Sequence, residues 1–466
     1  MMKIRFIGAD RQVTGSKYFF ETDDRRLLVD CGLYQERAFL DRNWKAFPVR
    51  PEEIDLMLLT HAHLDHCGYI PRLVADGFKG RILATAATAE LARIILLDSA
   101  HIQEEDAAFK KKRHAKEGRS GPHPEIPLYT VEDVEQAVLS FESVAYDKRI
   151  ALGRRTSVTF RDAGHILGSA MLDLESGEGD SVRRIIFSGD IGRWDSPLVR
   201  DPSVFGRADY IVMESTYGDR NHEDPEPIES LLTRFINETA GRKGKVVVPV
   251  FAMERAQELL YYLGKLIRIK RIPPLPVFLD SPMAVEVTQV FNRYPSYLDE
   301  EAKTVIRSGQ SLFEFPGLHL TPTMVESKAI NRVEGPAIIL AGSGMATGGR
   351  IKHHLEWNIG RPEATVLFVG YQAQGTLGRL ILDGAKEIRL FGGMVPVKAR
   401  VVRIAGFSAH AGKNELHRWL NAFVVRPRRL FVCHGDEKIS LGFAGELQAE
   451  GWTTVVPHYL EEFDLD

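Results

Sequence analysis

The feature that most constrains this chain is a short, largely apolar run, residues 54–60, followed at once by a cluster of histidines and aspartate. The run contains neither Gly nor Pro, which predicts a buried β-strand. Directly after it come His61, His63, Asp65 and His66. Imidazole nitrogens and carboxylate oxygens at this spacing are typical zinc ligands. The pattern favours a metal site at a strand end over a histidine-rich surface loop or core histidines bonded to backbone groups.

The order of residues within this cluster suggests two metal positions. His61 and His63 are two residues apart, so they can point the same way from an extended chain. We expect Asp65 and His66 to lie in the turn that follows, from where they could reach a second ion.

Strand-like runs alternate with helix-like ones throughout the chain, without internal repeats. This pattern predicts the α/β fold class, and 466 residues are enough for two domains with full cores. The expected strands are residues 3–7, 26–29, 81–84, 184–188, 210–214, 245–249, 337–341, 366–370, 401–404 and 429–432.

Further candidate ligands follow other expected strands. Asp30, Asp190 and His434 each come directly after a strand-like run, and His165 follows residues 161–164. One polar residue after one strand would only cap a turn. Together with the 61–66 cluster, these four supply enough donors for two metal ions.

Composition limits the location and the role of the cysteines. The first residues lack the apolar core of a signal peptide, and no stretch is apolar enough to span a bilayer. We therefore expect a cytoplasmic protein without a membrane partner. Cys31, Cys67 and Cys433 are too few for a disulfide framework. Each lies next to a candidate ligand, but packing as a small buried side chain is favoured over a metal role.

A basic run, residues 110–116, ends a long polar helical stretch, residues 88–116. The net charge of −3 argues weakly against a dedicated nucleic-acid binder. Clustered bases can attract phosphates, yet a charge run is often only a solvated helix face. Both interpretations remain open at this stage. Further bases occur at Arg350, Lys352 and His353.

Together these residues resemble a known family. Asp30, the 61–66 cluster, His165 and Asp190 look like the successive metal motifs of the metallo-β-lactamase fold. The downstream half resembles the β-CASP branch, nucleases related to the pre-mRNA 3′-end-processing endonuclease. The segments that carry this second resemblance are residues 214–219, 280–284, 341–350, 370–379, 407–410 and 433–435.

The resemblance covers essentially the whole chain and implies its architecture. It predicts a metallo-β-lactamase αββα sandwich with an inserted, doubly wound α/β β-CASP cap domain. The sandwich would comprise residues 1–215 and, after the chain returns, residues 391–466, with the cap at 216–390. The chain would begin directly in the catalytic sandwich, without the N-terminal RNA-binding domains of archaeal relatives.

The same resemblance implies two Zn²⁺ ions per chain. Asp190 would bridge the ions, and Asp30 would accept hydrogen bonds and orient the ligand loop. One ion would be held by His61, His63 and His165, and the other by Asp65, His66 and His434.

Asp65, His410 and Glu214 would be the catalytic residues. His410, with Glu214 behind it, resembles the pair that protonates the departing 3′-oxygen, since a carboxylate raises the pKa of an imidazole. His410 could instead act only as a phosphate-binding cation, an alternative that the general-acid interpretation outweighs.

A glycine-rich segment, residues 342–349, lies between an apolar strand-like run and the helix-like residues 350–357. Such a loop lets backbone N–H groups approach a phosphate, although many are only tight turns. Tyr371, Gln374 and Arg379 could line the same groove or form a structural turn. The predicted RNA phosphate contacts are Ser343, Gly344, Met345, Thr347, Gly348, Arg350 and Ser408.

The resemblance implies a zinc-dependent ribonuclease of RNA processing or decay that leaves 5′-phosphate and 3′-hydroxyl ends on single-stranded RNA. The alternatives are a DNA-directed nuclease related to Artemis and a non-catalytic RNA-binding subunit. His434 favours RNA, because the DNA branch typically has an apolar residue there, and the complete ligand set favours catalysis. Sequence leaves open endonuclease or 5′-3′ exonuclease action and the oligomeric state, with a homodimer among the options.

Overall fold

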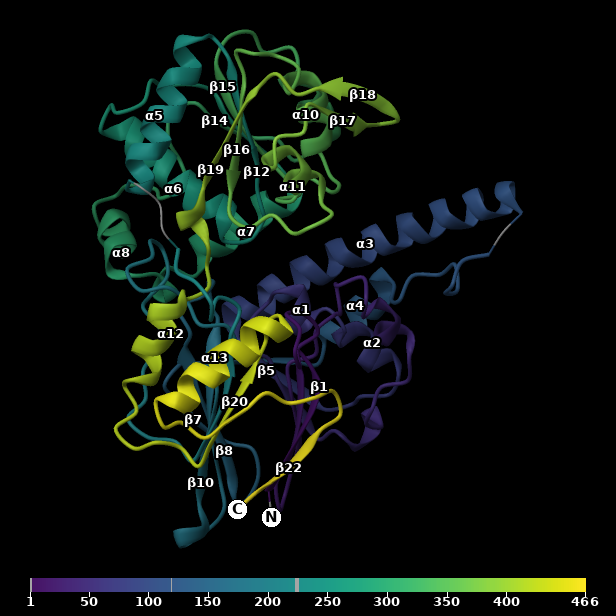
Figure 1. Cartoon of the computed structure of the whole chain (residues 1–466), viewed down its shortest axis with the longest axis vertical. Coiled ribbons are helices and arrows are strands. Elements are labelled where there is room, and N and C mark those ends of the chain that lie inside the picture. The colour runs from purple at the N-terminus through teal and green to yellow at the C-terminus, as the bar shows by residue number, and fades with distance from the viewer. Residues whose placement is uncertain (1, 119, 223–225) are drawn as a thin grey trace. The chain divides into compact units, whose positions relative to one another are not determined.

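The computed structural model describes residues 2–118, 120–222 and 226–466 (Figure 1). The chain forms two compact units. The first unit comprises Met1–Asn221 and His410–Asp466, and the second unit comprises His222–Ala409. Each unit has its own sheets and core, so each is described by itself.

The first unit contains two seven-stranded sheets. One has the order β22 (Glu462–Leu465), β1 (Met2–Gly8), β2 (Lys17–Glu21), β3 (Arg26–Val29), β4 (Leu56–Leu58), β5 (Arg81–Thr85) and β6 (Phe141–Val144). The other has the order β21 (Thr454–Val455), β20 (Arg429–Cys433), β11 (Tyr210–Glu214), β10 (Arg183–Phe187), β9 (Ala170–Ser176), β8 (Thr156–Asp162) and β7 (Arg149–Ala151).

Apolar side chains from both sheets form one shared core. The rings of Phe6 and Phe431, from different sheets, lie 5.0 Å apart, and those of Phe20 and Phe187 lie 6.2 Å apart. Because alternate residues of a strand point to opposite faces, each sheet turns one apolar face toward the other.

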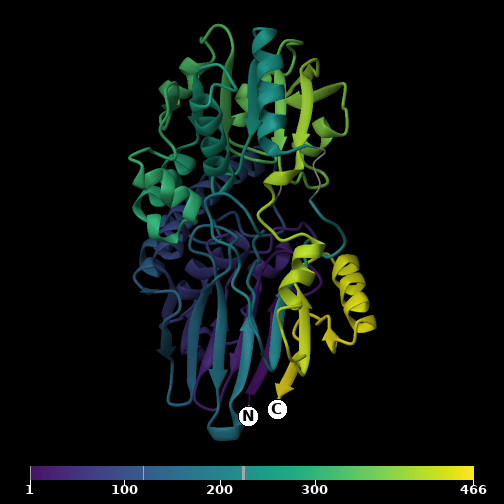
Figure 2. The ribbon, with the colours of Figure 1, turned by 90° about the vertical axis from the view of Figure 1, so that its left-hand side faces the viewer.

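Helices cover the outer faces of this sandwich. Trp419 and Phe443 of α12 (Lys413–Leu420) and α13 (Glu437–Ala449) pack on the outer face of the sheet that contains β20, and both helices appear in yellow in Figure 2. Helix α3 (Ala86–Glu117) contacts β5 and β6 of the other sheet. The other helices of this part of the chain are α1 (Leu64–Cys67), α2 (Ile70–Ala75) and α4 (Val131–Val138).

The second unit is built on a six-stranded sheet whose printed pairs are all parallel. Its order is β14 (Leu318–Leu320), β13 (Val277–Asp280), β15 (Ala337–Ala341), β12 (Lys245–Pro249), β16 (Thr365–Val369) and β19 (Arg400–Ile404). A hairpin of β17 (Glu387–Leu390) and β18 (Gly393–Pro396) stands beside it.

Both faces of this sheet are buried, as expected for a parallel sheet between helices. Val247 faces a core shared with Ile351 and Ile381, while its neighbours Val246 and Val248 are also buried. The helices are α5 (Ile228–Gly241), α6 (Arg255–Arg268), α7 (Pro282–Arg293), α8 (Glu300–Arg307), α9 (Met324–Ile330), α10 (Ile351–Asn358) and α11 (Leu377–Leu382).

The predicted α/β class is confirmed, and all ten expected strands are present to within one residue or two at their ends. Two local expectations need correction. The expected strand 54–60 is the shorter β4, and Asp65 and His66 lie in helix α1 rather than in a turn. Strand β19 belongs to the sheet of the second unit although it lies beyond residue 390. The predicted domain limits stay a prediction. Within the described residues, no helix combines the length and apolar character that crossing a membrane requires.

Candidate metal centre

Strand ends of the first unit place the candidate ligands. Strands β3 and β4 are parallel neighbours, as are β10, β11 and β20, so their carboxyl ends meet at common sheet edges. Asp30, Asp190 and His434 follow three of these ends. Asp30 has φ +56° and His434 has φ +48°, a left-handed backbone that is uncommon outside glycine. Such backbone is retained where surrounding structure requires a particular side-chain direction.

The first ligand group is His61, His63, His165 and Asp190. The Nδ1 atom of His63 lies 3.1 Å from Nε2 of His61 and 3.2 Å from Nε2 of His165. Oδ2 of Asp190 lies 3.3 Å from Nε2 of His61 and 3.5 Å from Nε2 of His165. Four donor atoms thus surround one point.

The second ligand group is Asp65, His66 and His434. The Nε2 atoms of His66 and His434 are 3.1 Å apart, and Oδ2 of Asp65 lies 3.4 Å from Nε2 of His434. The other oxygen of Asp190, Oδ1, lies 3.3 Å from Nε2 of His66. One carboxylate therefore presents one oxygen to each group, so all seven predicted ligands are brought together.

This arrangement fits a pair of bound cations. Tetrahedral zinc with bonds of about 2.0–2.1 Å separates its ligand atoms by about 3.3 Å, which matches the distances above. Neutral imidazoles carry only one N–H each, so hydrogen bonds among themselves cannot satisfy so many facing nitrogens. Oδ1 of Asp190 is buried and, within the described part of the chain, accepts no hydrogen bond. A buried carboxylate oxygen in that condition is expected where an ion binds.

The charges of the first ligand group also suit metal binding. Burial lowers the pKa of His61 to about 3 and that of His63 to about 4, and it lowers the pKa of His165 well below the usual range. These imidazoles are therefore neutral at pH 7, the form that binds metals. Burial alone would raise the pKa of Asp190, but the imidazoles of His434 and His66 hold it well below its usual value.

Hydrogen bonds from neighbouring side chains fix the orientation of the ligands. Asp30 accepts hydrogen bonds from N–H and Oγ1 of Thr60, both at 2.8 Å, and lies 2.8 Å from Nδ1 of His66. Oγ1 of Thr60 also lies 3.0 Å from Nδ1 of His61, and Oγ1 of Thr216 lies 3.1 Å from Nδ1 of His434. Outer partners of this kind set the tautomer of a ligating histidine. Sequence analysis named Asp30 but missed the two threonines, whose signal was their position beside ligand motifs.

His410 and Glu214 form a pair beside the first ligand group. Nδ1 of His410 lies 3.1 and 3.2 Å from the two carboxylate oxygens of Glu214. Glu214 is 1% exposed, and its Oε1 also accepts a 2.6 Å hydrogen bond from N–H of Ile191. Burial alone would lower the pKa of His410, but the carboxylates of Glu214 and Asp190 raise it to about 9. The imidazole is thus protonated at neutral pH, with its Nδ1–H held by the carboxylate.

Six of the seven predicted phosphate contacts lie in the second unit, in the loop between β15 and α10. The Oγ atom of Ser343 accepts hydrogen bonds from N–H of Thr347 at 3.1 Å and of Gly348 at 3.3 Å, so the loop folds on itself. Among the described residues, none accepts a hydrogen bond from N–H of Gly344 or Met345. Two successive N–H groups of this kind can bind an anion.

Arg350 and Ser408 are placed differently from the other predicted phosphate contacts. The guanidinium of Arg350 donates 2.7 Å hydrogen bonds to Oδ1 of Asp280 and to the carbonyls of Thr321 and Pro322. Ser408 follows β19, which lies three strand positions from β15, or about 14 Å at the usual strand spacing. The phosphate contact predicted for Ser408 stays a prediction. The guanidinium of Arg350 is occupied by bonds that hold the loop.

Asp280 is a polar centre that sequence analysis did not assign. It is fully buried, and its Oδ2 lies 2.6 Å from Nε2 of His354 and accepts a 2.6 Å hydrogen bond from Ser327. Burial alone would raise the pKa of Asp280, but its bonds to His354, Ser327 and Arg350 lower it. The aspartate therefore ties the start of α10 to β13 and α9.

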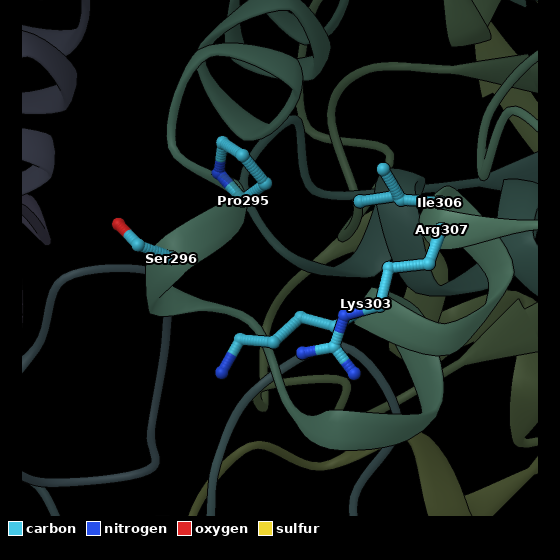
Figure 3. A pocket seen from close by; sticks show the side chains of 5 residues that line it. All are labelled: Pro295, Ser296, Lys303, Ile306 and Arg307. Atoms are coloured by element: carbon cyan, nitrogen blue, oxygen red, sulfur yellow. The ribbon is translucent and has the colours of Figure 1, made fainter. Parts of the chain in front are cut away.

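Two other features do not add to the site. Cys31, Cys67 and Cys433 are buried, and none belongs to a ligand group found among the described residues, which agrees with the packing interpretation. An open pocket of the second unit is lined by Pro295, Ser296, Lys303, Ile306 and Arg307 (Figure 3). Glu300 pairs with both of its cations.

Comparison with known proteins identifies three domains along the chain. Residues 19–189 match the metallo-beta-lactamase superfamily domain, residues 256–381 the Beta-Casp domain, and residues 394–457 the Zn-dependent metallo-hydrolase RNA specificity domain. A solved structure of a protein of unknown function from Enterococcus faecalis V583 covers all of both chains with a TM-score of 0.59 at 13% identity. That likeness concerns the fold alone.

Two curated relatives extend over nearly the whole chain. Ribonuclease TTHA0252 of Thermus thermophilus is 38% identical over 450 residues, covering 97% of each protein. Transcription termination factor FttA of Methanocaldococcus jannaschii is 32% identical, covering 95% of this chain and 68% of the relative. The chain belongs to the β-CASP family of metallo-β-lactamase-fold proteins. The predicted sandwich with an inserted β-CASP domain is thereby confirmed, and the chain is a metal-dependent hydrolase of the nuclease class.

Proposed function

We propose that this protein is a zinc-dependent ribonuclease that hydrolyses phosphodiester bonds of single-stranded RNA, leaving 5′-phosphate and 3′-hydroxyl ends. The observation that carries the proposal is the paired ligand groups that share Asp190, with the imidazole of His410 beside them. Nδ1 of His410 lies 4.0 Å from Oδ2 of Asp190 and 3.1 Å from Oε1 of Glu214. The ribonuclease among the relatives and the RNA specificity domain at residues 394–457 support RNA as the substrate. The termination-factor relatives support a role in RNA processing or decay.

In this proposal His61, His63 and His165 would hold one zinc ion, Asp65, His66 and His434 would hold the other, and Asp190 would contribute one oxygen to each. When bound, two such ions activate a water molecule and offset charge on a phosphoryl oxygen. The nitrogen and carboxylate donor set favours zinc over calcium or magnesium, which prefer oxygen ligands.

The proton for the departing 3′-oxygen would come from His410. Glu214 holds the Nδ1–H of the ring, so the proton that can be transferred is on Nε2. A raised pKa of about 9 keeps that proton in place at neutral pH. After transfer, the carboxylate of Glu214 favours reprotonation of the ring, which readies it for the next cycle.

The loop after β15 would bind the RNA backbone through the N–H groups of Gly344 and Met345, with Ser343, Thr347 and Gly348 shaping it. Arg350 would act by position, fixing the end of the loop to Asp280. We also propose a cytoplasmic place of action, because three buried thiols without a disulfide suit a reducing compartment.

The test is incubation of the purified protein with RNA labelled at its 5′ or 3′ end, with and without chelator. We expect chelator-sensitive products that carry 5′-phosphates. Products from the interior indicate endonuclease action, and mononucleotides released progressively from the 5′ end indicate exonuclease action. Cleavage of DNA in preference to RNA would contradict the proposal, and so would RNA binding without cleavage by the zinc-loaded protein.

A further inference from the structure

The distal half of helix α3 is an exposed, basic extension of the first unit, seen in blue in Figure 1. We define the arm as residues 101–117. Its last two turns contain Lys110, Lys111, Lys112, Arg113 and Lys116, all exposed, against one carboxylate, Glu117. Within the described part of the chain, none of the four lysines forms an ion pair. The last two turns of the arm therefore present a concentrated positive charge to solvent, whereas Glu104, Glu105 and Asp106 lie in the turns before them.

The arm is held in place on one side by the segment that follows it. Nδ1 of His114 lies 2.5 Å from Oε1 of Glu125, and the side chain of Gln103 accepts a 3.1 Å hydrogen bond from N–H of Leu128. His114 and Ala107 are buried on that side. The helix ends in the usual way, with Gly118 in the left-handed conformation. The arm is thus an ordered part of the fold.

The other side of the arm carries exposed apolar groups among the cations. Phe109 is 62% exposed, and Ile102, seven residues earlier on the same helix face, is 54% exposed. The guanidinium of Arg113 lies 5.8 Å from the ring centre of Phe109. Aromatic rings and guanidinium planes beside lysines are the groups on which single-stranded nucleic acids stack.

A purely structural explanation of these bases is incomplete. Cations near a helix C-terminus offset the helix dipole, but that effect falls off within the last turn. It can account for Lys116, which lies in the last turn, yet not for the four cations Lys110–Arg113 before it. Nor does it explain a phenylalanine left in water between them, because burying such a ring is favourable by about 1.5–3 kcal/mol.

The helix that carries the arm is bonded at its start to a loop of the metal centre. Oγ1 of Thr85 and of Thr88, at the start of α3, donate hydrogen bonds of 2.7 and 2.8 Å to the carbonyl of Gly168. Gly168 lies in the loop that carries His165. From Ala86 to Phe109 a helix rises about 35 Å, at 1.5 Å per residue. One rigid helix therefore links the ligand loop to the basic surface.

We propose that the arm is a docking surface for the single-stranded RNA strand that the metal centre cuts, bound by its phosphates on Lys110–Arg113 and by a base on Phe109. This proposal rests on the proposed ribonuclease function. RNA is the occupant that the charge favours, since an apolar protein partner would not require four successive cations. The arm then adds affinity only for RNA long enough to reach it.

The experiment compares two RNAs of uniform composition, of 6 and 40 nucleotides, by fluorescence anisotropy across a salt series with zinc-loaded protein. A stacked strand of 6 nucleotides spans only about 20 Å, less than the rise of about 35 Å from Ala86 to Phe109. Lys111→Gln/Lys112→Gln should weaken binding of the 40-mer on the order of 10-fold near 0.1 M salt and lower its salt slope by about 1.4. Phe109→Ala should weaken it with no change of slope, as expected for lost stacking.

The matched control is Lys79→Gln/Lys148→Gln, which removes two exposed lysines of the same unit outside the arm. It should leave the ratio of 40-mer to 6-mer affinity unchanged, whereas the arm variant lowers that ratio. If the ratio of 40-mer to 6-mer affinity is the same for the arm variant and the parent at every salt concentration, the docking proposal is overturned. The arm would then be a solvated helix face or a surface for another partner. Parent protein that binds and cuts neither RNA would overturn the proposed function itself.

Discussion

The metal centre and the glycine-rich loop differ in how the chain builds a binding site. The centre gathers ligands from segments as distant as residues 61 and 434, and five of the seven are buried. The loop is one contiguous segment that folds on its own serine and offers backbone N–H groups. A site of convergent side chains depends on every member, whereas a site of backbone groups tolerates changes of side chain. Substitution of a ligand should therefore abolish the function of the metal centre, whereas substitution of a loop side chain should only alter the affinity of the loop for its ligand.

Loss of one ligand of the first group should have the largest effect. His63→Ala removes the nitrogen that lies 3.1 and 3.2 Å from those of His61 and His165. We expect metal analysis to find fewer than the two zinc equivalents of the parent, and cleavage to fall to background, as it should in the parent after chelation. His458→Ala, at an exposed histidine, should retain two equivalents and full activity. Full activity of metal-free protein would refute this role for the centre.

Loss of His434 tests the second ligand group and the choice of nucleic acid together. In the parent, single-stranded RNA should be cut in preference to DNA of the same sequence. His434→Ala should lose one zinc and its cleavage activity, because Nε2 of this residue faces both His66 and Asp65. An His434→Ala protein that keeps two zincs and the normal rate would mean that the histidine only caps β20, at a cost of about 1–2 kcal/mol in stability.

His410 should contribute to turnover without contributing to metal binding. His410→Ala should keep both zincs and lower kcat by roughly 10²–10⁴-fold, the usual contribution of general acid–base catalysis. Loss of zinc in this variant would show that His410 is a ligand instead. The test is needed because Nδ1 of His410 lies 4.0 Å from Oδ2 of Asp190.

The pH profile sharpens the assignment of His410. A general acid works only while protonated, so cleavage should decline as the pH rises through about 9, the raised pKa of His410. Glu214→Gln removes the nearest carboxylate that raises this pKa, so the alkaline limb should move toward the ordinary histidine value near 6.5. Chelatable metal should be measured at each pH, and an unshifted limb in that variant would exclude His410 as its source.

Buried strands could be predicted from the sequence more accurately than exposed ones. The strands 210–214, 245–249 and 337–341 were predicted at their observed bounds, because buried parallel strands are short apolar runs. Strands such as β14 and β18 were missed, since they lie at edges or in hairpins with mostly exposed residues. Pairing order cannot be read from local periodicity, so the sandwich came from the family resemblance rather than from the pattern.

In the candidate site, the ligands could be predicted from the sequence, but the partners that hold other side chains in place could not. Ligands at strand ends were predictable, because a strand fixes where its last residue points and the residue types are specific to metals. The partners of Arg350 were not, because Asp280 lies 70 positions earlier and nothing local distinguishes a guanidinium that binds a phosphate from one that binds a buried aspartate. Thr60 and Thr216 stand beside ligand motifs in the sequence, but a hydroxyl group there does not by itself indicate which histidine it will contact.

Arg350 offers the smallest and most discriminating test. If its guanidinium only positions the loop, Arg350→Met should raise KM for RNA by about 5-fold, equivalent to about 1 kcal/mol, with unchanged zinc and kcat. The salt dependence of KM should stay that of the parent, because no phosphate contact is lost. If the residue binds phosphate directly, as its sequence motif suggested, the salt slope should fall by about 0.7. Arg332→Met, at an exposed arginine of the same unit, provides the control.

The same variant should also lower the stability of the fold, because Asp280 loses a partner that lowers its pKa. The carboxylate of Asp280 stabilises the folded state above its unfolded pKa of about 3.9, and this stabilisation is lost as the pH falls through its lower folded pKa. In Arg350→Met that stabilisation should be smaller, and the melting temperature near pH 7 should drop by a few degrees.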